Sequence, residues 1–319
     1  MNITNVLKDH GVGIGKYGIG KTIQDYNLEE LYYKKYVANF PQIKPLANEA
    51  IAMDKYNTIW FSDKESVIRI DSDGNQIVKF TYASVSKIII YNDDIFVITH
   101  TGGLVDKCAR FSSGGTKIWE ITFDGRLSGF YCDEKTSYLY TSYYKSNYIY
   151  VIQIQASTGN YSTYATFSGS SHDDVSIRPN AYYYISGLYI FKKSLPSGVE
   201  QWSYPFDSYP GEIIVDKNGN VYTTSNRKLW KFDKDGNILW STDLTGSNSW
   251  KNYMFEDYRG YIYTMGEYII SKVSPDGKIM WEFNTGKSLN QLVSNEEDYI
   301  YSMQDSNIVK YNFGYKVIS

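Results

Sequence analysis

The strongest constraint on the fold is a repeat that runs from about residue 48 to the end of the chain. In most copies a turn glycine is followed four residues later by a large apolar residue. The pairs are Gly74/Val78, Gly115/Trp119, Gly159/Thr163, Gly198/Trp202, Gly236/Trp240, Gly277/Trp281 and Gly314/Ile318. Successive glycines are 41, 44, 39, 38, 41 and 37 residues apart. A regular spacing of about 40 residues is typical of stacked structural repeats that share one core.

A second register of aromatic residues keeps step with the glycines. Its members are Trp60, Phe96, Tyr140, Tyr184, Tyr222, Tyr263 and Tyr301. Period-2 alternation and Gly/Asn/Asp turns divide each copy into four strands, which in the fifth copy are 212–216, 221–225, 228–233 and 238–242. A lone four-stranded sheet leaves its faces exposed, whereas seven sheets packed radially cover one another. The sequence therefore predicts an all-β, seven-bladed β-propeller, with blades at about 48–83, 84–124, 125–167, 168–206, 207–246, 247–287 and 288–319.

The repeat resembles two known kinds of propeller. The turns DGNILW (235–240) and DGKIMW (276–281) are similar to those of quinoprotein-like (PQQ-type) repeats. The segment 51–78 resembles the repeats of virginiamycin B lyase-like propellers. The resemblance covers about residues 48–319 and implies the scaffold. The lyase-like group uses a histidine and acids that converge at the central channel, but these do not map residue by residue onto this chain. No quinone-binding set is recognisable, so no cofactor is predicted.

Four tryptophans recur at one position of the repeat, which predicts a common and substantially buried packing role between blades. They are Trp119, Trp202, Trp240 and Trp281.

Residues 1–47 lie outside the repeat and are predicted to form an extended docking arm and a capping strand. The tandem GIGKYGIGK (13–21) is followed by a predicted short helix around 25–35, a strand-like run at 36–40 and a Pro-bounded linker. The partner-docking residues of the arm are Ile14, Lys16, Tyr17, Ile19 and Lys21. Two segments compete to complete the last blade. We favour a C-terminal outer strand after Gly314, with 36–40 capping that junction.

Several short motifs have a chemical and a structural interpretation. Residues 15–22 match the phosphate-loop pattern, but the buried strand and the α/β pattern that this loop needs are missing. DSDGN (71–75) and DKDGN (233–237) resemble the start of a calcium loop without its glutamate, and we interpret both as hairpin turns. His10, His100 and His172 lack metal-ligand spacing, and the two cysteines, Cys108 and Cys132, indicate neither a disulfide framework nor a zinc site. No catalytic, cofactor-binding or metal-binding residues are predicted.

Charge and composition restrict the function classes. The net charge is −3, from 32 basic and 35 acidic residues that are interspersed, which disfavours nucleic-acid binding. The sequence contains no apolar run long enough for a membrane helix and no signal peptide, so we expect synthesis in the cytoplasm and no membrane insertion.

The remaining function classes are three. We favour a non-enzymatic interaction propeller whose partners are other protein subunits of a larger assembly, with a phage tail or tail-like particle (baseplate or fibre region) as the expected location. The alternatives are a propeller that binds carbohydrate, such as a cell-surface receptor, and an enzyme of the lyase-like group.

Overall fold

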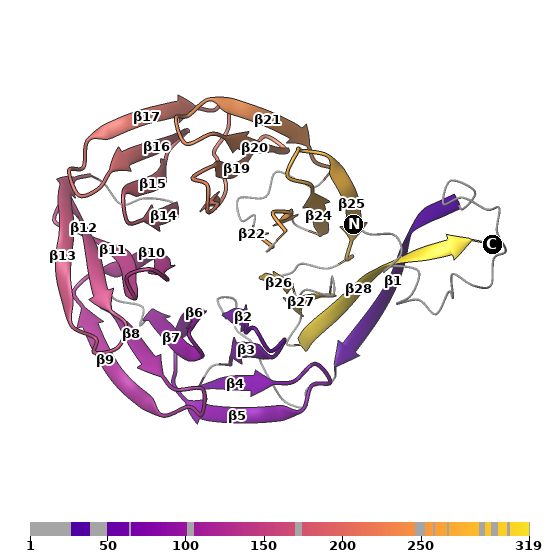
Figure 1. Cartoon of the computed structure of the whole chain (residues 1–319), viewed down its shortest axis with the longest axis horizontal. Helices are drawn as coiled ribbons and strands as arrows, with labels where there is room; N and C mark the ends of the chain where they lie inside the picture. Colours follow the sequence, from indigo (N-terminus) through magenta and orange to yellow (C-terminus); the bar gives the residue numbers. More distant parts are fainter. Residues whose placement is uncertain are drawn as a thin grey trace.

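The computed structural model describes residues 27–38, 50–63, 65–100, 105–169, 174–245, 253–257, 259–266, 268–286, 291–294, 299–304 and 307–318. They form seven four-stranded antiparallel sheets arranged around a central axis (Figure 1). The predicted seven-bladed propeller is therefore confirmed. Among the described residues, no helix long and apolar enough to cross a membrane is present.

Each blade runs from an innermost to an outermost strand. Blade 1 consists of β2 (Ile51–Met53), β3 (Ile59–Ser62), β4 (Ser66–Ile70) and β5 (Gln76–Thr81). Blade 2 consists of β6 (Val85–Tyr91), β7 (Asp94–His100), β8 (Asp106–Phe111) and β9 (Lys117–Phe123). Blade 3 consists of β10 (Arg126–Asp133), β11 (Tyr138–Lys145), β12 (Tyr148–Gln155) and β13 (Tyr161–Ser168). Blade 4 consists of β14 (Asp174–Arg178), β15 (Ala181–Ser186), β16 (Tyr189–Ser194) and β17 (Glu200–Pro205). Blade 5 consists of β18 (Ile213–Val215), β19 (Val221–Ser225), β20 (Lys228–Phe232) and β21 (Ile238–Asp243). Blade 6 consists of β22 (Tyr253–Glu256), β23 (Ile262–Met265), β24 (Ile269–Val273) and β25 (Ile279–Asn284).

Blade 7 takes its outermost strand from the other end of the chain. Its order from the centre is β26 (Leu292–Ser294), β27 (Tyr299–Gln304), β28 (Asn307–Ile318) and β1 (Asn27–Ala38). Two expectations were therefore wrong. Residues 27–38 form a strand rather than a helix, and Gly314 lies inside β28 rather than in a hairpin that leads to a C-terminal outer strand. Because β1 pairs along the whole of β28, the N-terminal segment closes the ring.

The core lies between neighbouring blades rather than within one of them. The aromatic register predicted from the sequence occupies the second strand of every blade, and each member is at most 8 % exposed. One buried cluster joins Tyr222 and Leu229 of blade 5 to Met254, Ile262 and Val273 of blade 6. Another joins blade 1 to Tyr301 and Ile308 of blade 7, so the first and last repeats are adjacent as predicted.

Blades 1 to 5 are each also held to the next blade by an aromatic ring of the outermost strand. Trp240 lies against the turn of blade 6 that contains Gly277, where an added Cβ would come within 2.7 Å of the indole. The indole N–H of Trp240 donates to the carbonyl of Pro275 in the same turn, at 3.1 Å. Trp202 repeats this arrangement with Gly236 and the carbonyl of Lys234.

Blades 1, 2 and 3 show variants of this contact. Trp119 packs on Gly159, while Phe80 and Phe167 take the place of the indole against Gly115 and Gly198. The predicted packing role of the tryptophans between blades is thus confirmed for Trp119, Trp202 and Trp240. Their indoles are half-buried rather than fully buried, because one edge faces solvent at the rim.

The contact between Trp240 and Gly277 can be measured by a double-mutant cycle. Gly277 has a φ of +84°, so Gly277→Ala combines backbone strain with the clash against the indole. We expect it to destabilise the fold by about 2–4 kcal/mol. Gly187→Ala is the matched control, because Gly187 also has a positive φ but has nothing within 4 Å of its added Cβ, and it should cost only about 1–2 kcal/mol.

Trp240→Ala should itself cost about 2–3 kcal/mol, below the value for a fully buried indole. It should also abolish the excess cost of Gly277→Ala, as measured by chemical denaturation. The contact does not hold the blades together if Gly277→Ala costs no more than Gly187→Ala and if its cost is the same with and without Trp240→Ala.

Ring closure by β1 predicts a sharp boundary in a truncation series. Removing residues 1–24 leaves β1 in place and should not change the melting temperature. Removing residues 1–38 should lower it and promote aggregation, because the edge of β28 then loses its partner strand. Thermal unfolding of both truncations tests this, and equal stability of the two would contradict closure by β1.

Candidate functional site

The first candidate site lies where the inner strands begin, at one mouth of the central channel. Side chains here accept a backbone N–H from the next blade. The carboxylate of Asp174 in blade 4 accepts from Ile213 N at 2.7 Å, and the carboxylate of Glu212 in blade 5 accepts from Met254 N. Gln291 of blade 7 accepts from Ile51 N at 3.0 Å. These side chains therefore join consecutive blades around the channel.

The charge of Asp174 affects the ionisation of Glu212 at this channel mouth. Burial raises the pKa of the Glu212 carboxyl, and the nearby charge of Asp174 raises it further. The Met254 N–H and the ammonium of Lys87 act in the opposite direction. The phenol of Tyr253 lies in the same group, since its pKa is raised by burial and by Glu212, against a hydrogen bond with Gln291. A carboxyl group with a raised pKa in a channel is a candidate for proton exchange or ligand contact.

Sequence reasoning did not find this channel group, although a signal existed. Glu212, Tyr253 and Gln291 each lie ten residues before the aromatic residue of the second strand in their blade. Aligning the repeats on that aromatic register would have placed all three at one position of the inner strand. The position carries Ala50 in blade 1, so its chemistry varies around the ring.

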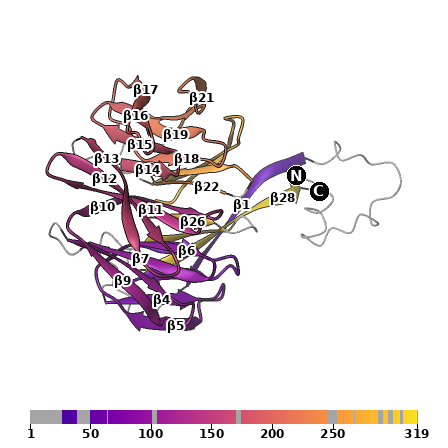
Figure 2. The ribbon, with the colours of Figure 1, turned by 60° about the vertical axis from the view of Figure 1, so that its left-hand side comes forward.

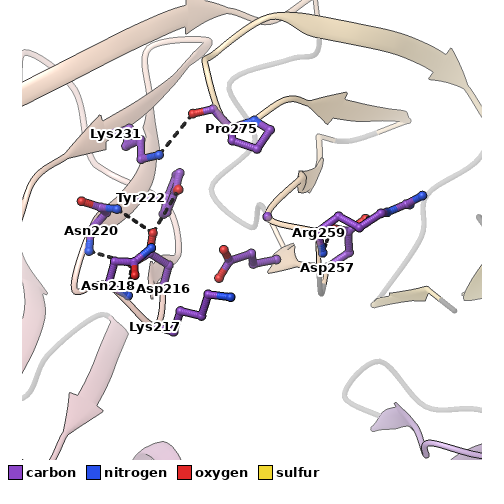
Figure 3. Close-up of a pocket in the computed structure, with 11 residues that line it drawn as sticks. Asp216, Lys217, Asn218, Asn220, Tyr222, Lys231, Asp257, Arg259 and Pro275 are labelled. Atoms are coloured by element: carbon purple, nitrogen blue, oxygen red, sulfur yellow. Dashed lines mark hydrogen bonds and ion pairs between the residues drawn. The ribbon is translucent and has the colours of Figure 1, made fainter. Parts of the chain in front are cut away.

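The second candidate site is a pocket of about 540 Å³ between blades 5 and 6, where the inner strands end (Figure 3). Most of its lining residues are polar or charged, and the full set is Asp216, Lys217, Asn218, Asn220, Tyr222, Lys231, Glu256, Asp257, Arg259, Gly260 and Pro275. The volume is within the range of small-molecule sites, which are usually more apolar than this one. Such a lining suits a hydrophilic ligand.

Two aspartates shape the opposite walls of this pocket. Asp216 accepts hydrogen bonds from the backbone N–H groups of Asn218 and Asn220, both at 2.8 Å, and from the Asn220 amide. Asp257 accepts from Arg259 N at 2.9 Å and pairs with the Arg259 guanidinium at 3.0 Å. These carboxylates order the turns of blades 5 and 6, and most of their acceptor capacity is used there.

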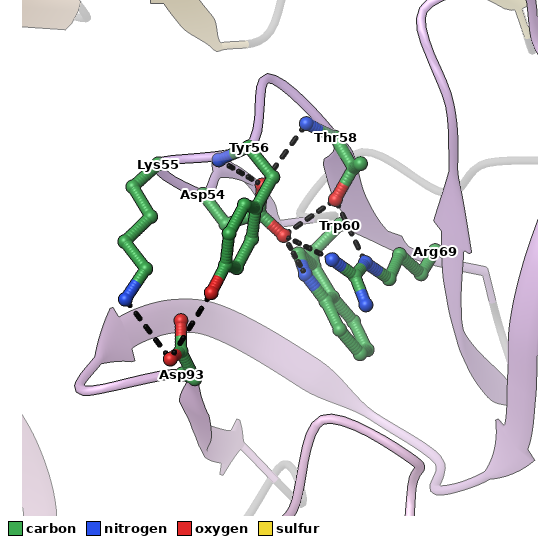
Figure 4. Close-up of polar contacts among 7 residues, drawn as sticks. All are labelled: Asp54, Lys55, Tyr56, Thr58, Trp60, Arg69 and Asp93. Atoms are coloured by element: carbon green, nitrogen blue, oxygen red, sulfur yellow. Dashed lines mark hydrogen bonds and ion pairs between the residues drawn. The ribbon is translucent and has the colours of Figure 1, made fainter.

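In the equivalent turn of blade 1, the charged side chains are paired with one another (Figure 4). Asp54 accepts from Thr58 N, from the Trp60 indole at 3.2 Å and from Arg69 at 2.8 Å. Burial alone would raise the pKa of Asp54, but the hydrogen bonds from Thr58 and Trp60 and the charge of Arg69 hold it below its ordinary value. Lys55 then bridges to Asp93 of blade 2 at 2.9 Å.

Most of the residues singled out from the sequence do not belong to either site. Ile14, Lys16, Tyr17, Ile19 and Lys21 lie outside the described residues, as do the phosphate-loop pattern, His10 and His172. His100 is described, and its Nδ1 lies 2.6 Å from a carboxylate oxygen of Asp106.

The remaining motifs have structural roles. Asp71 and Asp233 each accept the N–H groups of the residues two and four positions later, so the interpretation of both motifs as hairpin turns is confirmed. Cys108 and Cys132 are free thiols in one buried cluster, and burial raises the pKa of Cys132 to about 12. No group of three or more potential metal ligands occurs in the part of the chain that the structure describes.

Comparison with known proteins identifies the fold. No protein-family model matches the chain, and no curated protein matches its sequence. A solved streptogramin B lyase superposes with a TM-score of 0.67 at 16 % identity, covering 89 % of this chain and 98 % of the lyase. The computationally designed Ika8 protein gives a TM-score of 0.62 at 10 % identity, over 85 % of this chain and 97 % of the design. BamB from Moraxella catarrhalis gives 0.53 at 14 % identity, over 90 % and 98 % of the two chains. The resemblance to lyase-like and PQQ-type propellers is confirmed at the level of the fold.

The raised pKa of Glu212 predicts a pH-dependent stability. The folded state binds this proton more tightly than the unfolded chain, so the stability that it contributes is complete below the ordinary pKa of 4.5. That contribution is lost as the pH rises toward the raised value. Glu212→Gln should flatten this slope, measured as the free energy of unfolding against pH. Glu200→Gln on the exposed strand β17 is the control and should keep the wild-type slope. If the free energy of unfolding of Glu212→Gln depends on pH as steeply as that of the wild type, Glu212 is not the group that causes this dependence.

Proposed function

We propose that this protein is a non-enzymatic interaction propeller that docks into a larger assembly through its N-terminal segment and the strand that this segment pairs with. The observation that carries the proposal is a two-stranded ribbon that projects from the disc (Figures 1 and 2). Strand β28 pairs with β27 only over Asn307–Asn312, whereas it pairs with β1 as far as Ile318. Among the described residues, positions 313–318 have β1 as their only partner strand.

An isolated pair of strands is marginally stable in water, so a projecting ribbon favours a covering partner. Residues at alternate positions of a strand share one face of it. Phe313, Tyr315 and Val317 occupy alternate positions of β28, and their partners in register are Tyr33, Glu30 and Leu28. The intervening pair Glu29 and Lys316 is charged. This set of positions is rich in aromatic and aliphatic residues, which supports a contact between the ribbon and a protein surface.

The assembly that we favour is a phage tail or tail-like particle, with residues 1–24 continuing the contact beyond the ribbon. One solved protein with this fold is BamB. Residues Ile14, Tyr17 and Ile19 would bury apolar area, and Lys16 and Lys21 would pair with acidic groups of the partner. The gain must offset the cost of ordering a Gly-rich arm, about 1–2 kcal/mol per residue.

Sedimentation of the protein in extracts of its native source tests the proposal. The full-length chain should sediment with a particle far larger than its own 36.7 kDa. Truncation of residues 1–24 and Tyr315→Lys in the ribbon should each release a folded monomer, while Lys316→Gln at the next position should not. Full-length protein that sediments only as a monomer would exclude docking. Lys21→Ala should fold normally, and ATP or GTP binding that this substitution abolishes would restore the phosphate-loop interpretation.

A second candidate function is an enzyme of the lyase-like group, which the carboxyl pair of the channel favours. A carboxyl with a raised pKa is a suitable general acid near neutral pH. One protein with this fold is a streptogramin B lyase. The direct assay is the cleavage of a streptogramin B antibiotic by the wild type and by Glu212→Gln. Turnover that depends on Glu212 would replace the docking proposal as the primary function.

A further inference from the structure

The pocket between blades 5 and 6 has an open arrangement of the charges that are paired in blade 1. Lys217 follows Asp216 in the turn, as Lys55 follows Asp54. Lys55 is bound to the carboxylate of Asp93 in the next blade. Within the described residues, by contrast, Lys217 forms no ion pair, and the carboxylate of the next blade that its charge influences is Glu256. The turn of blade 5 thus presents its lysine to a cavity instead of to a partner.

Glu256 is the carboxylate of this pocket that has the fewest donors. It is half-buried at the end of β22, and no described group donates a hydrogen bond to it. Burial raises its pKa, and the charge of Asp216 raises it further, against Lys217 and Lys231. The Glu256 carboxylate lines the pocket without a donor from the described residues, so its oxygens are available to the hydroxyl groups of a ligand.

The other cations of the pocket are already engaged. Lys231 donates to the carbonyl of Pro275 at 3.2 Å and lies 5.1 Å from the Tyr222 ring centroid. Arg259 is paired with Asp257. The groups left to recognise a ligand are the Glu256 carboxylate, the Lys217 ammonium and the amide of Asn218, which all line this cavity. Figure 3 labels Lys217 and Asn218 on its blade 5 wall.

The balance of charge limits the ligand class. Three carboxylates and three cations line the pocket, so it has no net charge to attract a phosphate or a polyamine. A ligand that both donates to Glu256 and accepts from Lys217 and Asn218 is required. A hydroxyl group does both, and a ring with several hydroxyls does so in several directions. We propose that this pocket binds a neutral saccharide of one or two sugar units, held between Glu256 and Lys217.

Ligand-observed NMR with the full-length protein tests the proposal. The probes are glucose, galactose, N-acetylglucosamine, cellobiose and chitobiose at millimolar concentration, with inorganic phosphate, spermidine and glycine as competing chemistries. At least one of the sugars should bind. Glu256→Gln and Lys217→Ala should each lower the affinity for that sugar by about tenfold, a loss of roughly 1.4 kcal/mol in binding free energy. Lys55→Ala, at the equivalent turn of blade 1, should leave it unchanged.

Thermal unfolding of the three variants shows whether a loss of binding reflects the pocket or the fold. Weaker sugar binding by Glu256→Gln at an unchanged melting temperature supports the site. No binding of any sugar in the panel would overturn the proposal. It would also be overturned by sugar binding that resists both pocket substitutions, or by preferential binding of phosphate, spermidine or glycine. Because the ribbon is not involved, these results are independent of the docking experiment.

Discussion

The contact between an aromatic ring at the rim of one blade and a turn glycine of the next is the interaction on which the propeller depends. The glycine contributes a positive φ, which shapes the tight turn, and the absence of a Cβ, which lets the ring lie against the backbone. For Trp119, Trp202 and Trp240, an indole N–H bond to the carbonyl of the same turn fixes the orientation. No single blade buries its own faces. These contacts, at the junctions from blade 1 to blade 6, and the buried clusters between all neighbouring blades therefore make one cooperative ring out of seven small sheets.

A ring built in this way must be closed, and the closure connects the scaffold to the proposed docking. Strand β1 completes blade 7 over the half of β28 that also pairs with β27, and it continues into the projecting ribbon. The same strand therefore serves the fold and the proposed interface. A partner that covers the ribbon binds only the chain in which β1 is paired, and by mass action it would stabilise the closed ring.

The two candidate ligand sites follow from the direction of the inner strands. All seven inner strands run the same way through the channel, so their first residues meet at one mouth and their last residues at the other. Asp174 and Glu212 gather at the first mouth, where they hold the next inner strand. Asp54, Asp216 and Asp257 occupy the second, where they order turns. The same turn of the repeat therefore has two outcomes. In blade 1 its lysine, Lys55, is held in an ion pair, whereas in blade 5 its lysine, Lys217, lines an open pocket.

The number of blades, the turns and the aromatic positions of the second strands could all be predicted from the sequence, because turn chemistry and period-2 burial depend on residues close together in the chain. The repeat also identified the tryptophans as contacts between blades. Which segment completes blade 7 could not be predicted and emerged only from the folded structure. The run NLEELYYKKYVA lacks clean alternation, and its partner β28 is about 280 residues away, so its conformation is set by a non-local pairing. The carboxylates at the channel mouth and in the pocket were missed for the same reason. Asp174, Glu212 and Glu256 belong to successive repeats. The pKa values of Glu212 and Glu256 are raised by burial and by neighbouring carboxylates that are brought close only when the blades pack together.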